Sequence, residues 1–183
     1  MMRRGSSALA GFMMLVAIGG SAPSATADAA RNVPIDTVFH DPGAPAFTYL
    51  MLQDCAPDHS GGCSMAFDGR TTMTGSIEGT TVYRGVGYFD GLSGVYRFEV
   101  WETFTGLVRG CGEGTLEWHG TGQGWASQVD PLTQTFPLEA NLAIVDGSGR
   151  GGLSGIAGSF KAEGRSTLWA EQNGTIKGAV TCP

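Results

Sequence analysis

The chain has 183 residues, 42% of them hydrophobic, which suits one domain with a single buried core. Its formal net charge is −6. Without the first 27 residues, which hold two basic residues and no acidic one, 9 basic residues face 17 acidic ones, a net charge of −8. Such an acidic chain argues against nucleic acid or an anionic membrane as a partner. Glycine is frequent, at 30 residues without a collagen repeat, which favours a turn-rich all-β domain over disorder.

The first 27 residues have the three parts of a secretory signal peptide. Arg3 and Arg4 form a charged start, an apolar run spans Ala8 to Ile18, and a small-x-small cleavage pattern follows at residues 25–27. The apolar run is too short to cross a bilayer, which takes roughly 20 residues. We therefore expect residues 1–27 to be removed and the mature protein to be secreted, with no membrane attachment.

All four cysteines lie in the mature part, and an even number in an exported chain is typical of disulfides. We expect Cys55 to pair with Cys63, because the short polar loop between them closes easily, and Cys111 to pair with Cys182 by elimination. A metal site is the alternative, but the chain has no Cys-x-x-Cys pair and only His59 is close to a cysteine in the sequence. We expect neither a metal nor a cofactor.

Residues 28–45 are rich in Ala, Pro and Asp and keep no sustained period, so a flexible N-terminal segment is expected before the main domain, residues 46–183. No stretch of that domain keeps a helical period for three turns. Strands are expected where Thr, Val and aromatic residues gather between glycines and turn signals. These stretches are Phe47 to Gln53, Arg70 to Glu78, Thr80 to Phe89, Val95 to Phe104, Leu107 to Cys111, Thr115 to His119 and Leu138 to Ile144.

Two further hairpins are expected in the C-terminal part. Leu142 to Phe160 runs from an apolar strand through a glycine-rich turn into a second strand, whose repeated glycines indicate bends or close backbone approach. Asn173-Gly174 lies between two strand-like runs and favours a type I′ turn. The alternative for this site is a glycosylation sequon, because Thr175 follows. In the last strand, period two predicts that Cys182 points inward.

Short strands at regular spacing with glycine turns leave either a sandwich or a closed barrel, and periodicity alone does not choose between them. Four blocks carry a further signal, in order between Met65 and Val180: Thr74 to Thr80, Trp101 to Gly106, Leu116 to Thr121, and Ile144 to Gly158.

These blocks resemble an uncharacterised bacterial family, a domain of unknown function common in actinobacteria that is similar to the allene oxide cyclase and dirigent barrels. The last block is the most specific. The resemblance implies a single antiparallel eight-stranded closed β-barrel. In such a barrel the glycine-rich bends of Leu142 to Phe160 favour a hairpin that closes it. The family has no settled activity to carry over.

Glu102 is the first candidate for chemistry. Period two places it on the same strand face as Tyr96, Phe98 and Phe104. A carboxylate among aromatic rings should have a raised pKa through desolvation, so it could act as a general acid or base. The alternative is a structural role, in which Glu102 reaches solvent at the strand end or pairs with an arginine such as Arg109.

His119 is the second candidate, because it follows Trp118 at a strand end and matches a histidine of the resembled family. It would work with Glu102 if both reached one cavity. However, Glu117 and His119 share the face opposite Trp118, so His119 facing solvent is the alternative. The side chains expected to contact a ligand are Tyr88, Phe98, Trp101, Arg109 and Trp118.

Residues 147–152 have the glycine spacing of a dinucleotide-binding loop, but a strand follows in place of a helix, so no helix N-terminus is there to bind a pyrophosphate. No nucleophile elbow is present in the sequence. This motif is therefore interpreted as a structural turn.

Three functions remain open from the sequence. The favoured hypothesis is a secreted barrel that binds a small apolar or aromatic molecule, or a protein partner, without chemistry. The second is a cyclase or isomerase that shapes a small hydrophobic substrate, as the resemblance to allene oxide cyclases implies, with Glu102 and His119 as its polar groups. The third is a structural protein of the cell envelope. The oligomeric state is left open.

Overall fold

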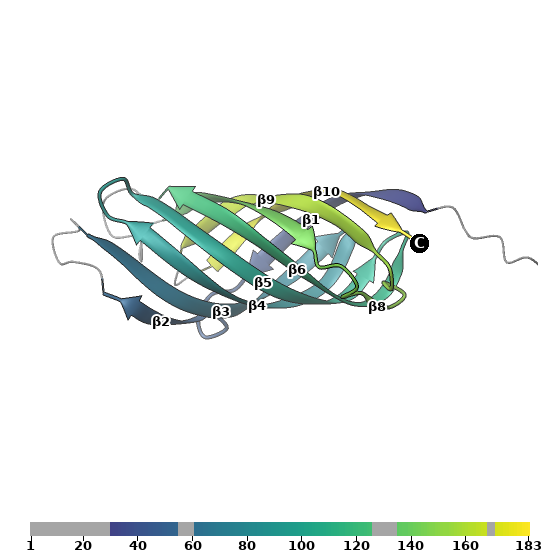
Figure 1. Cartoon of the computed structure of the whole chain (residues 1–183), viewed down its shortest axis with the longest axis horizontal. Helices are drawn as coiled ribbons and strands as arrows, with labels where there is room; N and C mark the ends of the chain where they lie inside the picture. The colour runs from purple at the N-terminus through teal and green to yellow at the C-terminus, as the bar shows by residue number, and fades with distance from the viewer. Residues whose placement is uncertain (1–29, 55–60, 126–134, 168–170) are drawn as a thin grey trace, which may run out of the picture.

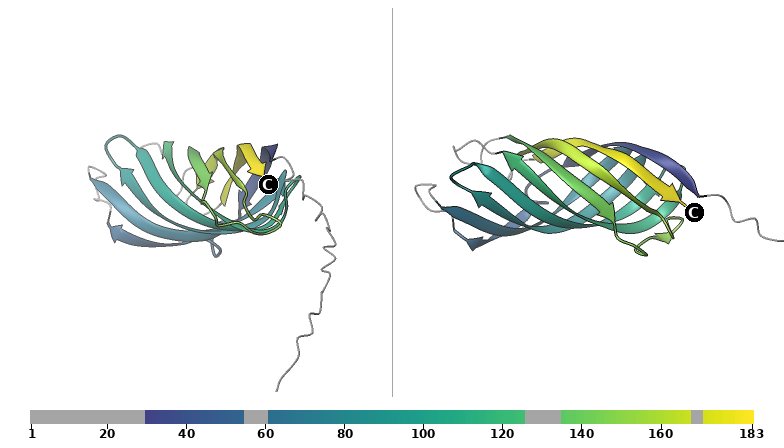
Figure 2. Two further views of the ribbon diagram at one scale, coloured as in Figure 1. Left: turned by 45° about the vertical axis from the view of Figure 1, so that its right-hand side comes forward. Right: turned by 45° about the horizontal axis from the view of Figure 1, so that its top comes forward.

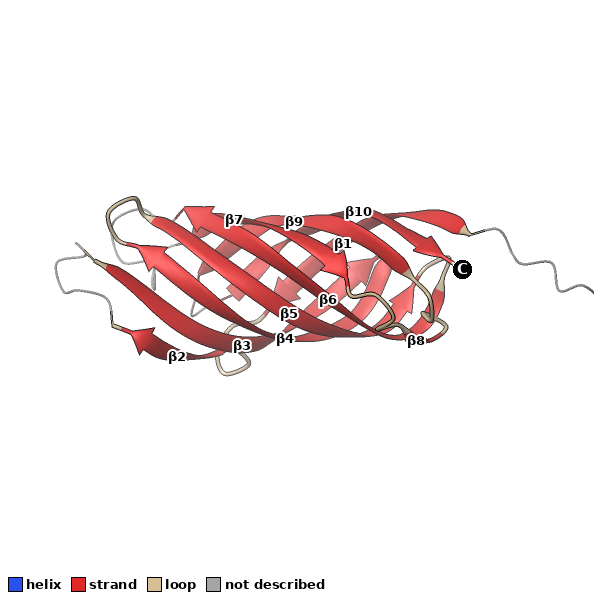
Figure 3. Cartoon of the chain, viewed as in Figure 1, coloured by secondary structure: helices blue, strands red, loops and turns tan. Residues whose placement is uncertain are grey.

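The computed structural model describes residues 30–54, 61–125, 135–167 and 171–183, and these residues form strands and turns (Figure 3). None of the described residues belongs to a helix that could span a membrane. The strands are β1 (Arg31–Asp41), β2 (Thr48–Gln53), β3 (Gly62–Gly75), β4 (Ile77–Asp90), β5 (Val95–Val108), β6 (Gly112–Trp125), β7 (Phe136–Ile144), β8 (Arg150–Gly151), β9 (Ala157–Thr167) and β10 (Glu171–Cys182).

Eight of these strands close into one antiparallel barrel, as predicted. The pairing runs β1-β10-β9-β7-β6-β5-β4-β3, and β1 also pairs with β3, which completes the ring. The strands run obliquely around this ring (Figures 1 and 2). Closure leaves each ring strand with a partner on both sides, so the barrel interior can be filled by every second side chain.

The two remaining strands lie outside the ring. β2 pairs with the first half of β3, whereas β1 pairs with the last residues of β3 along the same edge. β2 therefore extends the sheet at one end of the molecule (Figure 1). β8 is a two-residue strand that pairs with β6 near the other end. We call these the β2 end and the C-terminal end.

The expectation of a flexible segment over residues 28–45 is wrong for its described part. Arg31–Asp41 forms β1, which pairs with β10 along its full length. Its buried positions alternate from Ile35 to Asp41, but two of the four are Thr37 and Asp41, so the hydrophobic alternation that marks a strand is missing from the sequence. The predicted signal peptide lies outside the described residues.

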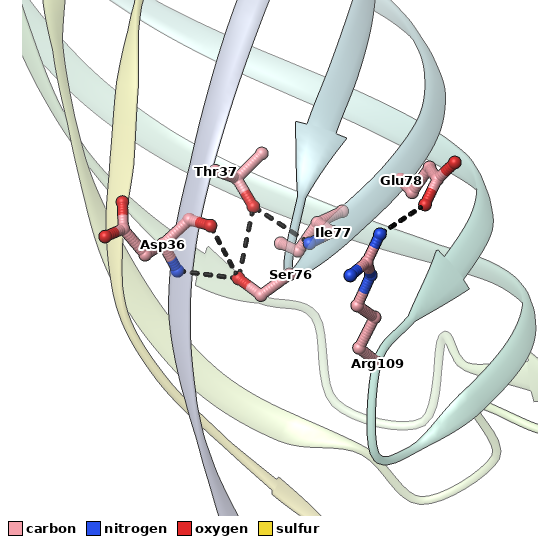
Figure 4. A network of polar contacts seen from close by, with 6 residues as sticks. All are labelled: Asp36, Thr37, Ser76, Ile77, Glu78 and Arg109. Atoms are coloured by element: carbon pink, nitrogen blue, oxygen red, sulfur yellow. Dashed lines mark hydrogen bonds and ion pairs between the residues drawn. The ribbon is translucent and has the colours of Figure 1, made fainter.

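Side-chain hydrogen bonds hold β1 against the turn between β3 and β4 (Figure 4). Ser76 Oγ accepts a hydrogen bond from the Asp36 backbone N–H at 2.6 Å and donates one to the Asp36 carbonyl at 2.9 Å. Thr37 Oγ1 lies 3.3 Å from Ser76 Oγ and accepts a hydrogen bond from the Ile77 N–H at 2.8 Å. These hydrogen bonds therefore extend the contact between β1 and β3, which closes the barrel, beyond the last paired residues of the two strands.

The strands are longer than the sequence predicted, because glycines that were expected to end strands lie inside them. Asn173-Gly174 is the clearest case: it is part of β10, so the predicted type I′ turn there is wrong. Gly174 pairs with Gly164 of β9, and a Cβ at these positions would lie 2.8 and 2.9 Å from the Phe39 ring. The glycines make room for an aromatic ring and do not mark a turn.

The C-terminal end of the barrel is plugged. The connection from β7 to β9 folds over it and buries Leu153 and Ile156 in the main core. Leu142 to Phe160 is thus a hairpin between neighbouring strands, but it caps the barrel, and the pairing of β1 with β3 and β10 closes the ring.

The predicted disulfide between Cys111 and Cys182 is confirmed, and it ties the last strand to the β5–β6 turn at this same end. Cys182 points inward and is buried, as period two predicted. Cys63 is also disulfide-bonded, while Cys55, its predicted partner, lies outside the described residues. The pairing of Cys55 with Cys63 stays a prediction.

Candidate functional site

A cavity of about 90 Å³ lies inside the barrel, in the half toward the β2 end. Its polar lining groups include Thr71, Glu102, Ser166 and Gln172. The rest is apolar, and seven aromatic rings dominate it: Phe39, Phe47, Phe67, Tyr83, Tyr96, Phe98 and Phe136. An apolar pocket with a few convergent polar groups is the usual form of a small-molecule site.

Glu102 faces this cavity, as predicted from the strand period. It lies on β5 directly between Tyr83 of β4 and Trp118 of β6 in the sheet register. Part of its surface remains accessible, and that part faces the lumen. The pKa of Glu102 is raised to about 7, chiefly by burial away from bulk water and less by the nearby Asp41 charge, against opposing contributions from Trp118 and Thr81.

The donors around Glu102 are incompletely satisfied. Trp118 Nε1 and Thr81 Oγ1 lie close enough to the carboxylate to lower its pKa, yet neither makes a hydrogen bond of normal geometry. The buried hydroxyl of Ser166, on the cavity wall, also has no hydrogen-bond partner. Unpaired buried polar atoms are costly, and a ligand or water in the cavity would satisfy them.

A second buried carboxylate, Asp41, stands beside this site. Its Oδ1 accepts a hydrogen bond from the Gly43 N–H at 2.8 Å, and its Oδ2 accepts one from the Tyr83 hydroxyl. Burial, followed by the Asp41 charge and hydrogen bond, raises the pKa of Tyr83. Tyr83 therefore stays protonated and holds Asp41 in place at the end of β1.

His119 lies on the outer face of the barrel, so the structure does not bring it together with Glu102. Its Nε2 is 2.8 Å from Glu99 Oε1, and its ring stacks on Trp101 with centroids 5.0 Å apart. The solvent-facing alternative is the one the structure shows, because His119 follows the inward-facing Trp118 by one residue on β6. A joint role of Glu102 and His119 in one cavity has no geometric basis.

The residues expected to contact a ligand divide between the two faces. Phe98 lines the cavity, and Trp118 is fully buried behind Glu102, toward the C-terminal end. Tyr88 and Trp101 are exposed on the outside, since they alternate with inward-facing residues on their strands. Arg109 is also outside and pairs with Glu78 at 3.1 Å, so it does not neutralise Glu102 (Figure 4).

Sequence reasoning missed Asp41, Tyr83 and Ser166. Asp41 falls in the segment that was expected to be flexible. Ser166 begins the strand-like run before Asn173-Gly174, where a turn was wrongly predicted. Tyr83 could have been found, because the alternation of β4 places it on one face with Ile77 and Phe89. Among the described residues, no group of three or more His, Cys, Asp or Glu is placed to hold a metal ion.

No protein-family model matches the chain, and no curated protein matches it. Among solved structures, it is similar to the crystal structure of a protein of unknown function from the DUF3224 family of Shewanella oneidensis MR-1, at 16% sequence identity and a TM-score of 0.53. The match covers 84% of this chain and 98% of that chain. At this identity the likeness shows the fold alone.

Fold and site together define an eight-stranded barrel with an aromatic, acidic lumen. The similar solved structure is that of a protein of unknown function, so it assigns no activity to this chain. The resemblance to actinobacterial proteins and to allene oxide cyclase or dirigent barrels stays a prediction.

Proposed function

We propose that this chain is a secreted barrel that binds a small, mainly apolar molecule in its lumen. The observation that carries the proposal is the aromatic cavity with an unpartnered buried hydroxyl, Ser166, on its wall. The Cys111–Cys182 disulfide suits an oxidising compartment, which supports secretion.

The cavity volume limits the ligand. An apolar cavity of roughly 150 Å³ accepts a benzene ring in another protein, so about 90 Å³ suits a molecule of only a few heavy atoms, or one end of a longer ligand. Suitable neutral probes are therefore short alcohols and small hydrocarbons, such as 1-propanol and cyclopentane.

The test is NMR of the wild-type protein labelled at its methionine methyl groups. Met73 lines the cavity, so its methyl resonance should shift in a saturable way when a probe is added. Ala140→Leu should abolish the shift because Ala140 also lines the cavity, whereas Ala143→Leu, on the outer face of the same strand, should not. Ala162→Leu serves as a second filling variant.

A Met73 resonance that no probe moves would overturn lumen binding, and so would a saturable shift that survives both filling variants. The wild-type titration does not depend on the variants folding, so the proposal stays testable if a filled lumen proves unstable.

A cyclase or isomerase is the second candidate, favoured by Glu102, the carboxylic acid among the described residues that line the cavity. With a pKa of about 7, Glu102 can hold or release a proton at neutral pH inside an apolar chamber. Under this function Glu102→Gln should abolish turnover, while His119→Ala should leave it unchanged because His119 lies outside. Equal activity in both variants would exclude Glu102 as the catalytic group.

A further inference from the structure

We infer that the lumen selects a small organic ammonium ion, held by the Glu102 carboxylate against the aromatic wall. This inference rests on the proposed function and specifies the chemical class of its ligand. Three features of the cavity carry it: the sign of its charge, the unmet hydrogen-bonding capacity of its polar groups, and the chemistry of its walls.

The charge of the site is one-sided. Among the described residues that line the cavity, Glu102 is ionisable as an acid and none is Lys, Arg or His. Asp41 lies close enough to raise the pKa of Glu102, which adds to the negative field. A buried carboxylate without a counter-ion is expensive, and a cationic ligand would supply one.

Hydrogen bonding points to the same ligand class. Both oxygens of Asp41 already accept hydrogen bonds, from Gly43 and Tyr83, so Asp41 is satisfied by the protein. Among the described residues, the donors near Glu102 are Thr81 and Trp118, neither of which makes a hydrogen bond of normal geometry, so Glu102 retains acceptor capacity. An ammonium group brings three N–H donors, which suit a carboxylate with unused acceptor capacity.

The walls favour a cation over an anion. The rings of Phe67, Tyr83, Tyr96 and Phe98 surround the cavity, and aromatic faces attract cations, most strongly where water is excluded. An anion of the same size would meet Glu102 and Asp41 with no positive partner among the described lining residues. A neutral molecule would fill the space and leave the Glu102 charge uncompensated.

The titratable groups around Glu102 are Asp41 of β1, Tyr83 of β4 and Tyr96 of β5, and burial raises the pKa of both tyrosines. From β6 the facing side chain is Trp118, which does not titrate. Near neutral pH, Glu102 exchanges a proton, because its pKa is about 7. A bound cation lowers its pKa, so binding at pH 7 should release up to about half a proton.

The experiment compares three probes of nearly equal size: n-propylammonium, 1-propanol and propionate. Isothermal titration calorimetry at pH 7, in two buffers of different ionisation enthalpy, gives affinity and proton release together. We expect n-propylammonium to bind at least ten-fold more tightly than 1-propanol and propionate not to bind. In Glu102→Gln the preference should vanish with the proton release, while Glu117→Gln, which removes an exposed charge from β6, should keep both.

The outcomes separate the two proposals. If 1-propanol binds as well as n-propylammonium in the wild type, or if the preference survives Glu102→Gln, the ammonium inference is wrong and lumen binding stands. Preferential binding of propionate would also overturn it. If no probe binds and the Met73 methyl resonance does not move, lumen binding itself fails.

Discussion

At the scale of single residues, the lumen is organised by two acidic side chains with different surroundings. Each oxygen of Asp41 accepts a hydrogen bond, one from the Gly43 N–H and one from the Tyr83 hydroxyl. Glu102, which lies directly opposite Tyr83 in the sheet register, faces the cavity, and its nearby donors make no hydrogen bond of normal geometry. The first pair stabilises the wall of the barrel, whereas the second carboxylate retains chemical capacity that the protein alone does not use.

The raised pKa of Glu102 predicts a pH-dependent cost to stability. The folded pKa of about 7 lies above the ordinary value of 4.5, so the folded state binds the extra proton between these values. The contribution of Glu102 to the free energy of unfolding therefore falls as pH rises from 4.5 to 7, by about 3 kcal/mol at most. Glu102→Gln removes this cost. The free energy of unfolding of the variant, minus that of the wild type, should therefore increase between pH 4 and pH 8. Urea denaturation across this range measures the gain.

The control for this prediction is Glu117→Gln, which makes the same charge change on the exposed face of β6. Its difference from the wild type should stay nearly constant with pH. A Glu102→Gln variant that shows the same flat profile would mean that Glu102 is well solvated in the folded protein.

How far the sequence predicts this site depends on the element that carries each residue. Glu102 and Phe98 were placed on the inner face because period two puts them on one face of β5 with Tyr96 and Phe104, although Trp101 of the same strand lies outside. His119 was ambiguous, because β6 carries Trp118 inside and Trp125 outside, so aromatic residues do not identify its inner face. The contact of Asp41 with Tyr83 spans 42 residues, and no local pattern encodes it.

At the scale of elements, β1 decides whether the sheet is a barrel or an open sheet. It is the strand that pairs with both β3 and β10, and Ser76 fastens it beyond the ladder (Figure 4). Its sequence did not reveal this, because its inward positions include Thr37 and Asp41, which composition alone assigns to a mobile segment. Closure of the ring was thus expected from the resemblance and not from the strand that performs it.

Ser76→Ala tests this fastening. The change leaves the Asp36 backbone N–H without its side-chain acceptor and should cost about 1 kcal/mol, with faster hydrogen exchange at Asp36. Ser159→Ala, an exposed serine on β9, is the matched control and should change neither quantity. Unchanged exchange at Asp36 in the Ser76 variant would show that the regular ladder alone holds β1.

At the scale of the whole molecule, the two ends of the barrel differ. The C-terminal end is plugged by Leu153 and Ile156 and tied by the Cys111–Cys182 disulfide. The cavity lies toward the β2 end, where β2 extends beyond the ring. The polar groups that would meet a ligand therefore lie away from the cross-linked part of the core.

Removal of the disulfide should test the stability of the plugged end. The bond closes a loop with a sequence separation of 71, so the chain-entropy argument gives a loss of about 4 kcal/mol for Cys111→Ala/Cys182→Ala. Urea denaturation measures the loss, and probe binding at the other end should persist in the folded fraction. A variant as stable as the wild type would mean that packing around Leu153 suffices.

The pairing of β1 with β10 also sets the order of events during biogenesis. Arg31 lies opposite Cys182 and Asp41 opposite Gln172, so nearly the whole described chain separates the partners. Such long-range pairing forms slowly, and the ring cannot close on the ribosome before β10 has been made. Until then β1 and β9, the two strands that pair with β10, present open edges, which invite pairing with other chains. A nascent chain whose ring has not closed is also still unfolded enough to pass through a narrow channel, and a general secretion channel requires an unfolded chain.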